Sequence, residues 1–132
     1  MTDSTENITV FICGSALRGQ PDNQNLQDAE FVGATETAAV YRLHAVKDGW
    51  HPGIYEVDAD GIAIPGELYV MTPQQYTHLK DNEPPHMYPH EVKLTGGDTA
   101  IAFLYPKALI NEHSWPDIST YGGWAAYKAA TA

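Results

Sequence analysis

The chain has 132 residues, of which 43% are hydrophobic and 18% charged, a length and composition typical of one globular domain spanning residues 1–132. Its formal net charge of -10 makes nucleic acids and anionic membrane surfaces unfavourable partners. The single cysteine excludes an internal disulfide, and a polar N-terminus without a signal-peptide pattern favours a cytoplasmic location.

The first apolar run, residues 8–13, predicts a buried strand that opens directly into a loop. Gly14 and Gly19 give this loop the backbone freedom that a tight exit needs. Its N–H groups can point at one anion, so the loop is either a carboxylate-binding cradle or an ordinary strand-to-loop corner. A phosphate-binding loop is excluded, because Gln20 and Pro21 stand where Lys and Ser or Thr are required.

Extended structure is expected throughout the first half of the chain. After a polar segment with a short helix over residues 26–29, alternating and β-branched patterns predict four strands, at residues 31–37, 39–46, 50–57 and 62–71. Pro65 and Gly66 lie inside the last of these, which indicates a bulge or an edge strand.

The sequence at Thr72 predicts the start of a central helix. Thr72 can act as N-cap, Pro73 suits the first helical position, and Gln75 can complete a capping box. The proline pair at residues 84–85 prevents the helix from continuing far beyond Asn82. This helix is therefore expected over residues 72–82.

The second half of the chain adds two strands and a second helix. Residues 88–94 and 99–105 read as a hairpin joined by a glycine-rich turn. Small residues with Trp124 and Tyr127 three apart predict a C-terminal helix over residues 123–130. The whole pattern is that of a mixed α+β fold.

Glu83 is the acid with the most chemical interest, because it follows the central helix among apolar and aromatic neighbours. Leu79, Met87 and Tyr88 flank it in the sequence. A carboxyl group in such surroundings can have a raised pKa and exchange protons near neutrality. The alternative is a solvated acid at the C-terminus of a helix.

Other catalytic patterns are weak. His86, His90 and Glu91 are close in sequence, but their spacing does not define a metal site, so we expect neither a metal nor another cofactor. Ser15 lacks the Gly-x-Ser-x-Gly turn of serine hydrolases. Cys13 reads as a small buried hydrophobic residue.

Several segments resemble the gamma-glutamylcyclotransferase-like family. Residues 10–19 are similar to its glycine-rich signature, and residues 79–83 followed by Tyr88 are similar to the segment that carries its catalytic glutamate. Further landmarks occur in the family's order at residues 31–33, 41–43, 52–54 and 66–69. The resemblance implies a small β-barrel with one central helix and a C-terminal helix.

The resemblance also implies a reaction. Glu83 would be the general base that lets the substrate's α-amine attack its γ-glutamyl carbonyl, releasing 5-oxoproline. The small-molecule substrate would carry a carboxylate, held by the glycine-rich loop. The substrate-binding residues would be Cys13, Gly14, Ser15, Ala16, Leu17, Pro52, Gly53 and Tyr88.

Two further segments, residues 19–26 and 117–127, resemble the C-terminal domain of allophanate hydrolase in a free-standing form. That resemblance implies action on N-carboxycarbamate and an amidase partner. A histidine often stands in the loop of such domains, where this chain has Ala16. A binding or assembly module without turnover, and a homodimer formed through the aromatic C-terminal region, are the remaining alternatives.

Overall fold

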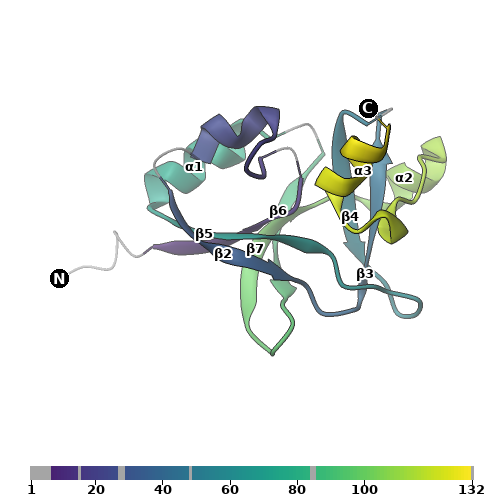
Figure 1. The fold of residues 1–132 in the computed structure, drawn as a ribbon, viewed down its shortest axis with the longest axis horizontal. Coiled ribbons are helices and arrows are strands. Elements are labelled where there is room, and N and C mark those ends of the chain that lie inside the picture. Colours follow the sequence, from purple (N-terminus) through teal and green to yellow (C-terminus); the bar gives the residue numbers. More distant parts are fainter. Residues whose placement is uncertain (1–6, 15, 27–28, 48, 84–85, 132) are drawn as a thin grey trace.

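The computed structural model describes residues 7–14, 16–26, 29–47, 49–83 and 86–131 and contains two sheets. The larger sheet has the strand order β2-β5-β1-β7-β6 (Figure 1). Its strands are β1 (Ile8–Ile12), β2 (Glu30–Glu36), β5 (Pro65–Met71), β6 (Tyr88–Lys93) and β7 (Thr99–Leu104). A separate antiparallel ribbon consists of β3 (Tyr41–Val46) and β4 (His51–Glu56).

β1 is the central strand of the larger sheet. It pairs antiparallel with β5 and parallel with β7, so that Val10 lies opposite Tyr69 on one side and Ile101 on the other. Val10 and Phe11 are almost completely buried, as expected for an apolar strand in the middle of a sheet. The predicted buried strand is confirmed.

The two outer strands of the larger sheet meet at one end. Thr37, directly after β2, bridges Leu94, directly after β6, and the Ala38 N–H donates to the Lys93 carbonyl at 2.9 Å. In the described part of the chain no longer ladder joins β2 to β6. The mixed α+β fold is thus confirmed, whereas the pairing does not amount to a closed barrel.

The helices cover two different regions. The 3-10 helix η2 (Pro21–Leu26) and α1 (Pro73–Asp81) lie together over the larger sheet, whereas α2 (Lys107–His113) and α3 (Trp124–Thr131) flank the β3–β4 ribbon (Figure 1). A further 3-10 helix, η3 (Ser119–Tyr121), precedes α3. None of the described helices has both the length and the apolar character needed to cross a membrane.

α1 starts as its sequence predicts. The Gln75 N–H donates to Thr72 Oγ1 at 3.2 Å, and the Thr72 N–H donates to Gln75 Oε1 at 2.8 Å, which completes the capping box. Leu79 is fully buried against the sheet. The helix ends at Asp81, three residues before the proline pair.

Two details differ from the sequence-based expectation. β5 lies between β2 and β1 and is not an edge strand. Pro65 is tolerated in it because it occupies the first position, where no ladder donor is needed. The bulge is in β2, at the register shift between Phe31 and Gly33. The expected short helix over residues 26–29 includes residues 27–28, which lie outside the described residues; the described helical turns before them are those of η2, which ends at Leu26.

The segment before η3 is fastened to β3. Ile118 N–H donates to the Leu43 carbonyl at 2.8 Å, and Arg42 Nε lies 2.9 Å from Asp117 Oδ2. Burial alone would raise the pKa of Asp117, but hydrogen bonds from Ser119 and Arg42 outweigh it and lower the pKa. This cluster attaches the C-terminal segment to the ribbon.

Candidate functional site

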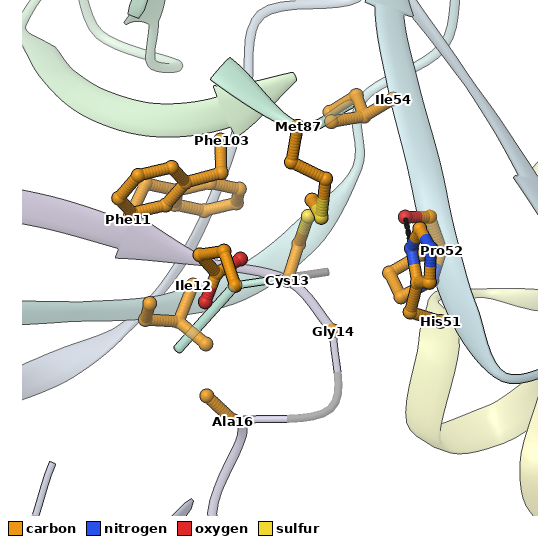
Figure 2. A pocket seen from close by; sticks show the side chains of 11 residues that line it. Phe11, Ile12, Cys13, Gly14, Ala16, His51, Pro52, Ile54, Met87 and Phe103 are labelled. Atoms are coloured by element: carbon orange, nitrogen blue, oxygen red, sulfur yellow. Dashed lines mark hydrogen bonds between the residues drawn. The ribbon is translucent and has the colours of Figure 1, made fainter. Parts of the chain in front are cut away.

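A pocket lies where the end of β1, the ribbon strand β4 and the segment after α1 meet. It spans about 440 Å³ including the solvent at its mouth. Figure 2 shows Phe11 and Phe103 at one end, Pro52 and His51 at the other, and Cys13 and Met87 between them. The lining residues are Phe11, Ile12, Cys13, Gly14, Ala16, His51, Pro52, Ile54, Glu83, Met87 and Phe103.

Gly14 brings the loop after β1 into direct contact with β4. A Cβ atom at this position would lie only 2.5 Å from Pro52 Cγ and 2.7 Å from Pro52 Cδ, closer than non-bonded carbon atoms can approach. On the other side, the Tyr105 N–H donates to the Ile54 carbonyl at 3.1 Å and ties β4 to the end of β7. The absence of a side chain at Gly14 therefore sets the width of the pocket.

Cys13 contributes a neutral thiol to the pocket. Burial, and then the negative charge of Glu83, raise the pKa of Cys13 to about 12. A thiol with this pKa is protonated at neutral pH and is a poor nucleophile. Cys13 can donate a weak S–H hydrogen bond, but the site does not activate it for covalent catalysis.

Glu83 lies just beyond α1 and is half-buried. Its N–H donates to the Lys80 carbonyl at 3.3 Å, which extends the last turn of the helix. Glu83 lines the same pocket as Cys13, the residue that follows β1. Among the described lining residues it is the only acid, and none is Lys or Arg.

Part of the loop after β1 is already hydrogen-bonded within the protein. The Leu17 N–H donates to the Gly14 carbonyl at 3.0 Å, and the Arg18 N–H donates to Glu67 Oε1 at 3.1 Å. A carboxylate held by this loop must therefore use N–H groups that come before that of Leu17 in the sequence.

The structure brings together five of the predicted site residues: Cys13, Gly14, Ala16, Pro52 and Glu83 all line the pocket. Leu17 is buried beside it without lining it, and Gly53 faces Val46, Ile110 and Tyr105 instead. Tyr88, at the start of β6, is exposed and outside the lining. Ser15 lies outside the described residues.

Sequence reasoning did not place Phe11, Ile54, Phe103 or His51 in the site. Ile54 and Pro52 alternate along β4, which would have put them on one face, but nothing local indicates that this face meets β1. His86, His90 and Glu91 are not gathered: His90 Nδ1 lies 2.7 Å from the Glu91 carbonyl oxygen, and His86 lies against the Tyr105 ring. No group of three or more possible metal ligands occurs in the described part of the chain.

Comparison with known proteins gives one family and several similar structures. The family of allophanate hydrolase C-terminal domains matches residues 8–129. A urea amidolyase of Saccharomyces cerevisiae is 27% identical over 131 residues, which are 95% of this chain and 7% of that protein. The chain thus spans a small part of this relative.

Among solved structures, a uropathogenic E. coli-specific protein is 26% identical, with 98% of each chain covered and a TM-score of 0.86. Kluyveromyces lactis allophanate hydrolase is 22% identical, with 100% of this chain and 22% of that chain covered and a TM-score of 0.89. An AIG2-like protein of Mus musculus is 20% identical, with 86% of each chain covered and a TM-score of 0.69. The Kluyveromyces lactis and Mus musculus proteins share the fold of this chain.

Proposed function

Because the chain belongs to the family of allophanate hydrolase C-terminal domains, we propose that it is a small-molecule enzyme whose active site is the pocket containing Glu83. The observation that carries this proposal is that Glu83 lines the same pocket as Cys13 and Gly14, which directly follow β1. A carboxylate facing backbone N–H groups across a small cavity can move a proton on a substrate that those groups hold.

The reaction we propose is of the cyclotransferase type. Glu83 removes a proton from the α-amine of a γ-glutamyl substrate, and the amine nitrogen forms a bond to the γ-carbonyl carbon. The bond between that carbon and the leaving amine then breaks, and the proton passes from Glu83 to the leaving nitrogen. The products are 5-oxoproline and a free amine, with the substrate carboxylate held by N–H groups near Gly14.

The charge of the pocket favours this reaction over the second candidate. Family membership and the urea amidolyase relative support action on N-carboxycarbamate, in partnership with an amidase. That compound carries two carboxylates, however, and would meet Glu83 in a pocket whose described lining includes no Lys or Arg. An amine-bearing substrate matches a negatively charged pocket better than a dianion does.

The test is a pair of substrates that differ by one carboxylate. γ-Glutamyl-propylamide and γ-glutamyl-α-aminobutyrate have the same leaving-group chain, and release of 5-oxoproline from each is measured by chromatography. We expect turnover of the propylamide at the higher kcat/KM, since no described lining cation can pair with the second carboxylate.

The second candidate requires a separate assay. The protein is added to an allophanate-hydrolysing amidase, and the release of ammonia and carbon dioxide is followed. Faster release in that mixture, together with no 5-oxoproline from either γ-glutamyl compound, would replace the cyclotransferase proposal with the amidase-partnered one.

A further inference from the structure

His51 is a buried histidine that the proposed reaction does not yet use. It is the first residue of β4, and its side chain lies beside Pro52 on the pocket wall (Figure 2). Only 2% of its surface is exposed. Its ring lies 5.0 Å from that of Trp50 and 5.5 Å from that of Tyr105, which hold it between two aromatic side chains.

One ring nitrogen of His51 has a defined proton. Nδ1 lies 2.9 Å from the Pro52 carbonyl oxygen, and a carbonyl oxygen only accepts, so Nδ1 carries the hydrogen. Burial lowers the pKa of His51; the hydrogen bond to Pro52 opposes this and the charge of Lys47 adds to it. The ring is therefore neutral, and Nε2 carries a free electron pair.

Nε2 is the unusual atom. It is buried, and it has no hydrogen-bond partner in the part of the chain that the structure describes. A buried acceptor without a donor is destabilising, and such atoms are rare in folded proteins.

We infer that His51 Nε2 accepts a hydrogen bond from an N–H group of the bound substrate. This inference rests on the proposed function, in which that group is the amide N–H of the leaving amine. Glu83 and Nε2 are both acceptors, so the described part of the pocket matches a substrate rich in N–H donors. His51 is then a positioning residue that selects substrates by this donor.

The first test observes the nitrogen itself. Protein carrying Glu83→Gln, which slows turnover, is labelled with ¹⁵N in histidine and titrated with γ-glutamyl-propylamide. Before addition, the His51 ring should show a protonated Nδ1 and an unprotonated Nε2. During the titration, the Nε2 resonance should move in the direction of a hydrogen-bonded acceptor, while the ring keeps its tautomer.

The outcomes separate the two claims. If backbone resonances near Gly14 shift and saturate while Nε2 of His51 does not move, the inference about His51 is overturned and the proposed function stands. If γ-glutamyl-propylamide moves no resonance, the proposed function fails and the inference falls with it. A protonated Nε2 in the free protein would overturn the inference directly.

The second test uses variants with glutamate at position 83. His51→Phe keeps a ring but removes the acceptor, and should raise KM about tenfold with kcat within about twofold, the change expected for loss of one neutral hydrogen bond. His51→Gln, whose side-chain oxygen can accept, should recover part of this loss. His78→Phe, on the exposed surface of α1, is the matched control and should behave as wild type. An unchanged KM in folded His51→Phe would overturn the inference.

Discussion

Replacing Gly14 with alanine tests how closely the loop after β1 approaches β4. The new methyl group would lie 2.5 Å from Pro52 Cγ and 2.7 Å from Pro52 Cδ. A proline ring is stiff and cannot rotate away, so the loop and β4 must separate. The φ angle of Gly14 lies outside the left-handed region, and the effect is therefore purely steric.

Overpacking of this kind costs about 2 kcal/mol. For a chain of 132 residues, the unfolding entropy is about 0.28 kcal/mol/K, so the midpoint of thermal unfolding should fall by about 7 °C. Widening the gap between the loop and Pro52 also displaces the N–H groups that hold the substrate. We expect kcat/KM to fall at least about tenfold, since small displacements of binding groups are costly.

Thermal unfolding followed by circular dichroism measures the first effect, and release of 5-oxoproline measures the second. Gly97→Ala is the matched control. Gly97 has a φ of +99° and open space around its Cβ position, so alanine there should cost about 1 kcal/mol through backbone strain alone and leave activity unchanged. If Gly14→Ala has wild-type stability and wild-type activity, the close approach of Gly14 to Pro52 is refuted.

Three further predictions concern other parts of the molecule. Because burial and Glu83 raise the pKa of Cys13 to about 12, iodoacetamide at pH 8 should label the native protein at least about 100-fold more slowly than the urea-unfolded chain; equal rates would contradict this. Asp117→Asn should lower the free energy of unfolding by about 1 kcal/mol at pH 7. The folded-state pKa of Asp117 is lowered, so its contribution to stability is present above the unfolded-state pKa and is lost as the pH falls through the folded-state pKa. The free energies of unfolding of the two proteins, measured by urea titration, should therefore converge below about pH 4. A difference in the free energy of unfolding that stays constant down to pH 2 would contradict this contribution of Asp117. Thr72→Ala should cost about 1 kcal/mol in the same assay by removing the capping box of α1, and an unchanged midpoint would contradict that role.

The elements predicted correctly from the sequence are those with a local signal. The capping box at Thr72 placed the start of α1, and the glycine-rich turn at Gly96 and Gly97 placed the β6–β7 hairpin. The helix α2 was missed for an equally local reason. Its N-cap is Pro106, which offers no side-chain hydrogen bond, and its seven residues are too short for a clear helical period.

The site depends on contacts between residues far apart in the sequence. Glu83 could be selected as a candidate from its position after a helix, but its approach to Cys13 follows from the pairing of β1 with β5 and the path of α1. The contact of Gly14 with Pro52 depends on how the β3–β4 ribbon docks on the larger sheet. No periodicity encodes such docking, and for this reason His51 could not be assigned to the pocket.

The most direct test of the account is the effect of Glu83→Gln on 5-oxoproline release from γ-glutamyl-propylamide. Glutamine keeps the size of the side chain but cannot accept the proton, so kcat should fall about 100-fold or more, while the thermal midpoint stays close to that of the wild type. Glu112→Gln, on the exposed surface of α2, should keep full activity. Wild-type turnover by a folded Glu83→Gln protein would contradict the central claim that Glu83 is the base.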